Sequence, residues 1–297
     1  MNCPICDGLD YWPIPFASDP KIESWRREES NEAAYDWRLC RRCANGYPSH
    51  QPHLRVLQKI WLEHKSTPGL SVATLEQTWE RRRAAGRAIA ARSFKIFGPL
   101  VGSSGGRFLD VACGFGETVK AFAEHGWHAE GIDADSSIAH LHREMDIHVR
   151  HGQIEEMDLG VGFDIIHIAH AIYFITNPMQ FLGEVRKRLA RDGLFCIVLS
   201  DFFAHHDPSL PSYAHTFFPT AASMRYALAL AGLKTIIYKR LSGSIYIAAR
   251  PASAITMPFV SPMWTRLLLR TKPLRYALIG RPYLTLRRTA KYLLSRR

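Results

Sequence analysis

The sequence predicts an α/β fold with a doubly wound, mostly parallel seven-stranded sheet, preceded by a small cysteine-bearing module and followed by a basic helical extension. Three observations support this prediction. An apolar run that carries one acid, residues 108–112, leads into a glycine-rich turn and a helical pattern. Strand and helix patterns then alternate as far as Ala249. Two Cys-x-x-C motifs lie near the N-terminus, and no Asp or Glu follows Asp207.

Length and charge divide the chain into regions. Its 297 residues, 47% of them hydrophobic, are enough for one large domain with appendages. We expect a cysteine module at 1–53, a helical linker or cap at 54–100, a main domain at 101–252 and a helical extension at 253–297. The net charge of +11 comes from the C-terminal third, because fifteen of the 38 Lys and Arg lie after Asp207. This asymmetry indicates an anionic partner, either a membrane surface or nucleic acid.

The four N-terminal cysteines form the motifs C-P-I-C (Cys3, Cys6) and C-R-R-C (Cys40, Cys43). Paired motifs of this kind place four thiolates around tetrahedral zinc, because each turn points two sulfurs at one position. Disulfides are disfavoured in a cytosolic chain, and neither pair lies in a thioredoxin-like context that would indicate redox chemistry. Four cysteine ligands leave no open position, so we expect a structural zinc ion.

Two helical patterns separate the cysteine module from the main domain. Residues 54–64 are amphipathic, and residues 71–97 form a long pattern with three consecutive arginines at 81–83. We expect these arginines on a solvated helix face, with binding of an anionic substrate as the alternative. Between the cysteine motifs, the charged stretch 21–36 is either a loop or a helix.

The main domain begins with a strand, a glycine turn, a helix and a second strand that ends on an acid, Asp133. In an open α/β sheet, ligands bind outside the carboxyl ends of the strands, and an acid after the second strand is placed to accept hydrogen bonds from a ribose diol. We therefore expect a nucleotide-like ligand. The parts of this unit are strand 108–112, the turn at Gly114 and Gly116, helix 118–125 and strand 129–132.

The glycine turn discriminates between nucleotides. The dinucleotide fingerprint G-x-G-x-x-G fails here, since its third glycine, counted from Gly114, is Val119. Counted from Ala112, it fails at the first position and ends on Glu117. Glu117 and Asp110 would repel a pyrophosphate and would tolerate a cationic sulfonium that carries an ammonium group. The turn therefore favours S-adenosylmethionine over NAD.

The rest of the main domain continues the alternation of helices and strands. A turn, Arg-Asp-Gly at 191–193, is expected to separate a helix from the strand after it. The last two strands flank a Ser-Gly turn and should form an antiparallel hairpin. The expected elements are helix 136–145, strand 147–151, strand 163–168, helix 178–189, strand 194–199, helix 221–231, strand 234–238 and strand 244–249.

Two stretches, DVACGFGETVKAFAEHGWHAEGIDAD and GFDIIHIAHAIYFITNPMQFLGEVRKRLARDGLFCIVLSDF, resemble class I S-adenosylmethionine-dependent methyltransferases over about half of the chain. The resemblance implies a parallel sheet with one reversed strand at its end. It also implies roles for particular residues around the cofactor. Asp110, Ala112, Gly114 and Gly116 would line the methionine end, Asp133 would hold the ribose, and Gln153 and Ile154 would contact adenine, although many relatives have an acid in place of Gln153.

The catalytic base is harder to assign from the resemblance. Many relatives have a Glu-His pair after the fourth strand, where this chain has Tyr173 and Phe174. His170 lies just before them. A later segment with Tyr213 and His215 resembles the aromatic-His-aromatic stretch of methyltransferases that act on sugars. Histidine suits this role because its ordinary pKa lies near working pH, so His215, His170 and Tyr213 are the candidate catalytic residues.

Beyond the main domain, residues 256–297 should form several short helices, because prolines at 258, 262, 273 and 282 interrupt the pattern. In the last of them, apolar residues form one stripe with Lys and Arg around it. Such a helix either lies in an anionic membrane interface or packs on the domain as an extra layer with a solvated basic face. The stripe consists of Tyr283, Leu286, Ala290, Leu293 and Leu294.

These features predict a methyltransferase that uses S-adenosylmethionine and a structural zinc ion. The expected acceptor is oxygen, or carbon, of a small molecule, a sugar or a lipid-linked glycan. The alternatives are an RNA methyltransferase, which the missing N-P-P-Y-like motif disfavours, and a non-catalytic cofactor-binding scaffold. No apolar stretch is long enough for a bilayer span and the N-terminus lacks a leader pattern, so we expect a cytoplasmic protein, peripheral to the inner membrane if its basic end binds lipid.

Overall fold

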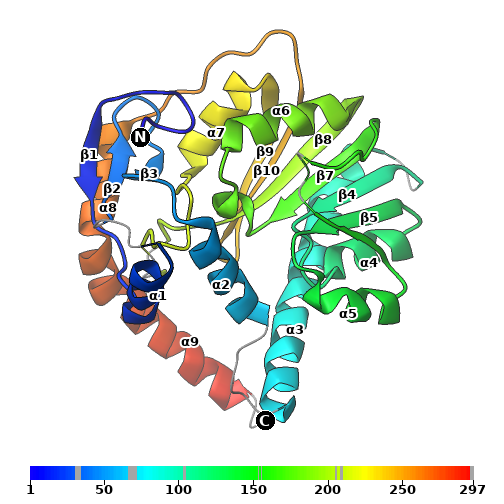
Figure 1. The fold of residues 1–297 in the computed structure, drawn as a ribbon, viewed down its shortest axis with the longest axis horizontal. Coiled ribbons are helices and arrows are strands. Elements are labelled where there is room, and N and C mark those ends of the chain that lie inside the picture. Colours follow the sequence, from blue (N-terminus) through cyan, green and yellow to red (C-terminus); the bar gives the residue numbers. More distant parts are fainter. Residues whose placement is uncertain are drawn as a thin grey trace.

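The computed structural model describes residues 1–30, 35–65, 72–102, 105–152, 154, 156–204, 206–207 and 210–294. It shows a large sheet flanked by helices, with a three-stranded sheet beside it (Figure 1). The large sheet has the order β6-β5-β4-β7-β8-β10-β9. Its strands are β4 (Arg107–Val111), β5 (His128–Asp133), β6 (His148–His151), β7 (Phe163–Ala169), β8 (Leu189–Ser200), β9 (Leu233–Leu241) and β10 (Ser244–Pro251).

This sheet confirms the predicted mostly parallel, seven-stranded architecture. β10 pairs antiparallel with both β8 and β9, so the reversed strand lies one position in from the edge and not at the end of the sheet. The order reverses direction at β4, whose neighbours are β5 and β7. The carboxyl ends of β4, β5 and β7 therefore meet at the switch point where α/β sheets bind ligands.

Alternate residues of each strand supply the two faces of the sheet, as strand geometry requires. Phe108 of β4 stacks on Phe122, 3.8 Å between ring centroids, and belongs to a buried cluster with Phe97. The next residue, Leu109, belongs to a second cluster that includes Phe181. Helices thus cover both faces, which makes the sheet doubly wound. These helices are α3 (Val72–Phe97), α4 (Glu117–Glu124), α5 (Ala139–Glu144), α6 (Pro178–Arg188) and α7 (Ala221–Leu230).

The expected helix 136–145 and the start of the expected strand 194–199 differ from what the structure shows. Three short 3₁₀ turns are also present in the described residues. The predicted helix 136–145 is a 3₁₀ turn, Ser136–Ile138, followed by α5. The predicted turn at 191–193 lies within β8, where the pairing with β7 is irregular. Gly193 is needed at this irregularity, because a Cβ there would come within 2.5 Å of the Phe163 carbonyl oxygen. The other 3₁₀ turns are Gly98–Leu100 and Ile172–Phe174.

The N-terminal region forms its own small sheet but shares its core with the main domain. Trp37 is 1% exposed and lies 6.3 Å from Phe218, ring to ring. Gly46 and Phe218 exchange two backbone hydrogen bonds, of 3.0 and 2.7 Å. The cysteine module is therefore docked on the segment around His215. Its elements are β1 (Tyr11–Ile14), α1 (Pro20–Ser30), β2 (Trp37–Cys40) and β3 (Gly46–Pro48), with α2 (Leu54–Lys65) after them.

The C-terminal region consists of two helices of 14 residues joined by a π-helical turn, so the predicted short helices are present but follow one another without a loop and form one helical rod. α8 (Pro262–Arg275) runs into a π-helical turn (Tyr276–Gly280) and then into α9 (Arg281–Leu294). Proline is tolerated at a first helical turn, and this accounts for Pro262 and Pro282. Pro273 lies inside α8, three residues before the π-helical turn, and the helix continues past it, with Tyr276 N–H donating to the carbonyls of residues 272 and 273.

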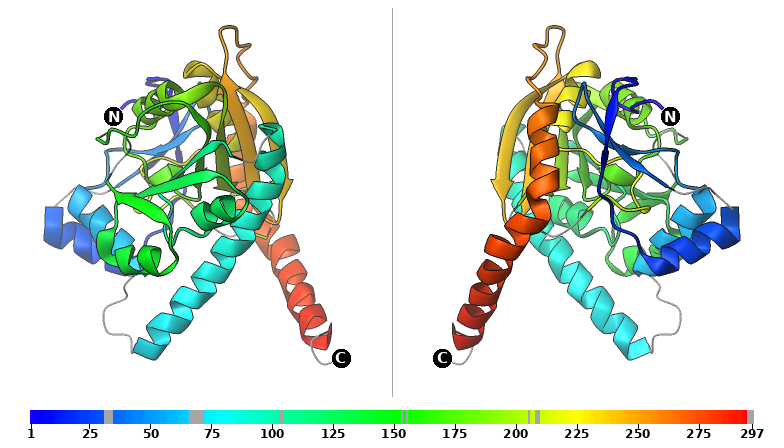
Figure 2. Two further views of the ribbon diagram at one scale, coloured as in Figure 1. Left: turned by 90° about the vertical axis from the view of Figure 1, so that its right-hand side faces the viewer. Right: turned by 90° about the vertical axis from the view of Figure 1, so that its left-hand side faces the viewer.

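The two halves of this rod differ in their surroundings. α8 packs on the small sheet, with Leu269 at 1% exposure and the Arg266 guanidinium 4.8 Å from the centre of the Trp12 ring. α9 extends away from the body (Figure 2), and nine of its ten residues from 281 to 290 are exposed. The packed-layer alternative thus holds for α8 and not for α9. Within the described ranges, every helix is too short or too polar for a bilayer span.

Candidate active site

Three residues of the loop after β4 have a left-handed backbone conformation. Ala112, Gly114 and Gly116 have φ values of +54°, +55° and +80°. Gly116 accepts the first α4 hydrogen bond, from Lys120 N–H at 2.9 Å. A Cβ on Gly114 would meet no atom within 4 Å, so this glycine borders open space. The loop therefore has room for a ligand to approach its backbone.

Asp133 ties this loop to the end of β5. Gly114 N–H donates to its Oδ2 at 2.7 Å, and Asp135 N–H donates to its Oδ1 at 2.9 Å. The residue is 6% exposed. Each carboxylate oxygen can accept more than one hydrogen bond. The Gly114 carbonyl, in turn, accepts a 2.8 Å hydrogen bond from His142 Nε2. No sequence signal predicted this contact of His142 with the loop.

Helix α3 covers the outside of the loop. Arg83 Nε lies 2.8 Å from Glu117 Oε1, and Arg87 lies 3.5 Å from the same atom. The ring of Trp79 lies 6.2 Å from that of Phe115, in the middle of the loop. Because two arginines balance Glu117, its charge does not repel an anionic ligand, and that part of the sequence argument against NAD is wrong. Arg83, predicted on a solvated face, instead holds α3 against the loop.

Asp110 belongs to a buried chain of three side chains. Its Oδ1 lies 2.7 Å from His167 Nδ1, and His167 Nε2 lies 3.1 Å from the hydroxyl of Ser93 on α3. All three residues are at most 3% exposed. Asp110 and His167 face each other across β4 and β7, a pairing that only the sheet register reveals. These three hydrogen-bonded side chains connect α3 to the sheet beneath the loop.

The predicted adenine contacts lie after β6. Ile154 is buried, with 2% exposure. Gln153 lies outside the described residues.

His170 follows β7 directly and has a left-handed backbone, with φ of +54°. Its N–H donates to the Val198 carbonyl at 2.8 Å, and its Nδ1 lies 3.2 Å from the Ser200 hydroxyl. Burial, together with the charges of His167 and Arg92, lowers the pKa of His170 to about 4. The imidazole is therefore neutral near pH 7 and can accept a proton there, although the lowered pKa makes it a weaker base than an ordinary histidine.

His215 lies in a cage of aromatic rings. Tyr173, Phe174, Phe202 and Phe218 have ring centroids 5.2, 5.8, 6.3 and 6.0 Å from its own. Burial lowers the pKa of His215 to about 4. Ser212 N–H donates to its Nδ1 at 3.2 Å, so the neutral ring carries its proton on Nε2 and presents a donor there.

The two candidate histidines belong to one cluster, which the sequence alone did not reveal. Ser200, beside His170, also hydrogen-bonds to Tyr173. Burial raises the pKa of Tyr173 to about 12, so this phenol stays protonated. Tyr213 lies elsewhere: it is 3% exposed, and its hydroxyl accepts a 3.1 Å hydrogen bond from His53 N–H of the cysteine module.

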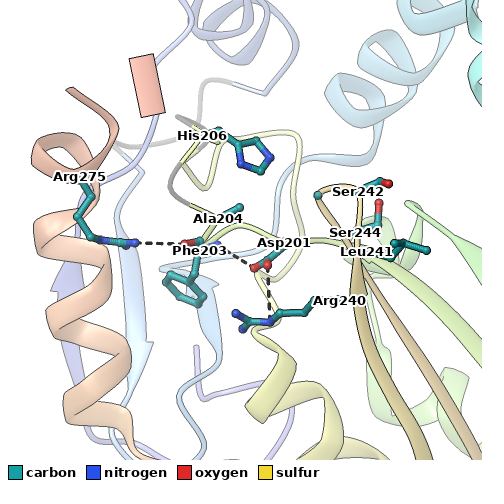
Figure 3. A pocket seen from close by; sticks show the side chains of 10 residues that line it. Asp201, Phe203, Ala204, His206, Arg240, Leu241, Ser242, Ser244 and Arg275 are labelled. Atoms are coloured by element: carbon teal, nitrogen blue, oxygen red, sulfur yellow. Dashed lines mark hydrogen bonds and ion pairs between the residues drawn. The ribbon is translucent and has the colours of Figure 1, made fainter. Parts of the chain in front are cut away.

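A separate hollow of about 360 Å³ lies between the loop that follows β8, the turn that joins β9 to β10, and Arg275 of α8 (Figure 3). Asp201 and Arg240 face each other in it at 3.6 Å, and Arg275 of α8 donates to the Phe203 carbonyl at 3.2 Å. It is lined by Asp201, Phe203, Ala204, His206, Arg240, Leu241, Ser242, Gly243, Ser244 and Arg275. None of these residues belongs to the loop around Gly114.

The four N-terminal cysteines converge as predicted. Their sulfurs all lie within 4.8 Å of one another, with Cys3–Cys43 and Cys6–Cys40 at 3.5 Å. Zinc at about 2.3 Å from each sulfur would separate neighbouring sulfurs by about 3.8 Å, so the donor set fits the ion. The two motifs also share one backbone geometry: Asp7 and Ala44, each following its second cysteine, have φ near +57° and +56° and donate to the carbonyl of the first cysteine.

A strand order of this kind, with a glycine loop after β4 and an acid at the end of β5, defines a class I S-adenosylmethionine-dependent methyltransferase. The chain belongs to this class: the family described as "Methyltransferase domain" matches residues 79–237, more than half of its length.

Two curated relatives are each called "Ubiquinone biosynthesis O-methyltransferase". The protein from Bradyrhizobium sp. (strain ORS 278) is 35% identical over 100 residues, which cover 32% of this chain and 40% of that protein. The protein from Ruegeria sp. (strain TM1040) is 27% identical over 143 residues, which cover 46% of this chain and 54% of that protein. The chain thus matches about half, or less, of the length of these relatives.

Among solved structures, Burkholderia thailandensis 1,6-didemethyltoxoflavin-N1-methyltransferase, with bound 1,6-didemethyltoxoflavin and S-adenosylhomocysteine, has a TM-score of 0.51 and 16% identity. The match covers 75% of this chain and 97% of that one. This likeness supports the fold.

The two loop glycines provide a matched pair of substitutions. A Cβ on Gly116 would come within 2.1 Å of Ile147 Cδ1, the end of a half-buried side chain that can move aside, so Gly116→Ala is expected to lower the free energy of unfolding by roughly 2–3 kcal/mol, mostly through left-handed strain. Gly114→Ala should cost only the strain, roughly 1–2 kcal/mol, and should weaken S-adenosylhomocysteine binding. Urea unfolding and calorimetry measure both effects. Equal stability losses in the two variants would contradict this account of the loop.

Proposed function

We propose that the chain transfers a methyl group from S-adenosylmethionine to oxygen, or carbon, of a small-molecule, sugar or lipid-linked glycan acceptor. One observation carries this proposal. Asp133, the loop at Gly114 and the neutral His170 all lie at the carboxyl ends of three neighbouring strands, β5, β4 and β7. A sugar-nucleoside group at Asp133 and a proton acceptor at His170 would thus share one edge of the sheet.

The cofactor would be held from three sides. In this proposal Asp133 accepts hydrogen bonds from the ribose hydroxyls, and the loop containing Ala112, Gly114 and Gly116 lies against the methionine portion. Ile154 and Gln153 contact adenine. Asp110 acts through His167 by keeping the loop in place. The cofactor supplies an activated methyl group, so the remaining task of the protein is to align the acceptor, exclude water and accept a proton.

We assign the base to His170 and not to His215. When Ser200 donates its proton to the Tyr173 oxygen, its own oxygen accepts from His170 Nδ1–H, and Nε2 of His170 is then the proton acceptor. In His215, by contrast, Nδ1 already accepts from Ser212 N–H. We therefore assign His215 to orienting the acceptor through Nε2–H. Tyr213 supports the cage by anchoring the module through His53 N–H.

The aromatic cage suggests the kind of acceptor. Tyr173, Phe174, Phe202 and Phe218 present flat apolar faces around one polar group, His215. Such a lining suits a ring that carries a hydroxyl, such as a sugar or a phenol. The name O-methyltransferase of both curated relatives supports oxygen as the acceptor atom.

Zinc would have a structural role in this scheme. The four cysteines would hold the ion, whose charge would stabilise the thiolates and fold the module at 1–53. The proposed division of the remaining chain is a cap at 54–100, a catalytic domain at 101–252 and an extension at 253–297. The cap assignment is supported by the contacts of α3 with the loop, through Arg83 and Trp79.

Asp133→Ala tests the cofactor site. It removes the acceptor of two loop hydrogen bonds and of the proposed ribose contacts, so S-adenosylhomocysteine binding should weaken about 100-fold, equivalent to roughly 3 kcal/mol. Asp192→Ala, at an exposed position in β8, is the control and should bind like the parent. Binding unchanged in Asp133→Ala would place the cofactor elsewhere.

The acceptor is found by incubating the protein with tritium-labelled S-adenosylmethionine and separate lipid and polar cell extracts. Label should move into a lipid-extractable or sugar-containing product. Label in RNA alone would favour the RNA alternative, and cofactor binding without transfer to any extract would favour the scaffold.

A further inference from the structure

The rod formed by α8, the π-helical turn and α9, residues 262–294, exposes a long apolar stripe. Among its side chains, Leu286 is 72% exposed, Leu278 67%, Leu274 59%, Trp264 58% and Ile279 53%. Leu274 and Leu278 are four residues apart, and Ile279, Tyr283 and Leu286 follow at spacings of one, four and three. Single exposed apolar residues are ordinary, but a continuous stripe of this length marks an interaction surface.

The charge of the same rod is of one sign. Residues 262–294 contain eight Lys and Arg and no acid, and the absence of acids extends from Pro208 to Arg297. On α9, Arg281, Arg287 and Arg288 are exposed beside the apolar stripe. The partner must therefore offer negative charge and an apolar layer together.

An anionic lipid bilayer meets both requirements. A second copy of the chain would bring basic residues against basic residues, which is unfavourable. RNA would match the charge but would leave Leu278 and Leu286 in water. A basic amphipathic helix, by contrast, lies in a bilayer interface with its leucines in the acyl boundary and its arginines at the headgroups.

We propose that α9, with the π-helical turn before it, docks the protein on an anionic membrane surface. The rod is also fixed to the proposed acceptor site. Lys272 Nζ donates to the Phe202 carbonyl. Arg275 donates to the Phe203 carbonyl at 3.2 Å (Figure 3). The ring of Phe202 forms one wall of the cage around His215. Docking therefore sets the orientation of this cage relative to the bilayer, a consequence that rests on the proposed function and suits a lipid-linked acceptor.

Vesicle flotation tests the docking surface. The full chain is mixed with phosphatidylcholine vesicles with and without phosphatidylglycerol, at low and high salt. Binding should require phosphatidylglycerol and weaken at high salt. Arg287→Gln with Arg288→Gln should lower the partition coefficient roughly 30-fold, at about 1 kcal/mol per basic residue. Lys234→Gln with Lys239→Gln removes the same charge from exposed positions of β9 and should leave binding unchanged.

The apolar stripe has its own pair of variants. Leu278→Gln with Leu286→Gln should lower partitioning at all salt concentrations, whereas Leu9→Gln with Val161→Gln, at residues 72% and 66% exposed, should not. All four residues are exposed, so folding should be retained. Equal binding to vesicles with and without phosphatidylglycerol, self-association through α9, or binding to RNA and not to vesicles would each overturn the proposal. S-adenosylhomocysteine calorimetry on the same variants should match the parent, which separates failure of docking from failure of the cofactor site.

Discussion

Replacing Cys43 with serine is expected to reduce zinc from one ion per chain to none. The four sulfurs converge within 4.8 Å, and a Cys₄ site loses its charge balance and tetrahedral geometry when one thiolate is removed. Structural zinc contributes roughly 10–16 kcal/mol to the folding of small zinc peptides, so this is the largest stability effect we expect in the chain. Because the module shares its core with the main domain, its unfolding should also lower the melting temperature of the main sheet.

Trp37, one of seven tryptophans, reports this unfolding in a variant whose other six are replaced by phenylalanine. It is 1% exposed in β2 and packs against Phe218, so its fluorescence should shift to the red when the module opens. Phe218 also lines the cage of His215, and loss of zinc should therefore lower methyl transfer while S-adenosylhomocysteine still binds.

The control for this experiment is Cys113→Ser. Cys113 lies in the loop after β4, outside the cysteine cluster, and this variant should retain one zinc ion per chain and a buried Trp37. Full zinc occupancy in Cys43→Ser, or a parent protein that binds no zinc and keeps Trp37 buried, would contradict the structural zinc assignment.

Replacing His170 with alanine is expected to lower turnover about 10²- to 10⁴-fold, the usual contribution of a general base, with S-adenosylhomocysteine binding retained. The methyl acceptor in this assay is the extract fraction in which labelled product forms. His128→Ala, at an exposed position on β5, is the matched control and should have parental turnover.

The pH profile of turnover gives a second readout of His170. Only the neutral imidazole accepts a proton, and the lowered pKa of about 4 keeps it neutral at higher pH. Turnover should therefore fall as pH drops toward 4 and should show no histidine step between about pH 6 and 8, where an ordinary histidine titrates.

The comparison with His215 decides between the two histidines. His215→Phe should fit the aromatic cage and should raise KM more than it lowers kcat, because His215 is proposed to orient the acceptor. A full loss of kcat in His215→Phe with normal kcat in His170→Ala would reverse the two assignments.

The main sheet was predictable because its signals are local. Each strand is marked by a short apolar run between turn residues, and the loop geometry depends on Gly114 and Gly116, so all seven strands and the turn after β4 are found close to where the patterns put them. The cysteine cluster was predictable for the same reason, since each motif forms its own turn.

The site contacts were not predictable, because they join elements far apart in sequence. Arg83 meets Glu117, Asp110 meets His167 and Gly46 meets Phe218 only after the sheet and α3 are assembled. The tautomer of His215 likewise depends on one backbone N–H, that of Ser212. Pro273 shows the converse, because the local rule that proline ends a helix fails at this position inside α8.

A crystal structure with S-adenosylhomocysteine tests the central claim most directly. The account predicts ribose hydroxyls within hydrogen-bonding distance of the Asp133 carboxylate, the amino-acid portion beside Gly114, and the sulfur on the side of the loop that faces His170. Ligand density elsewhere, such as in the hollow beside Asp201 and Arg240, would contradict it.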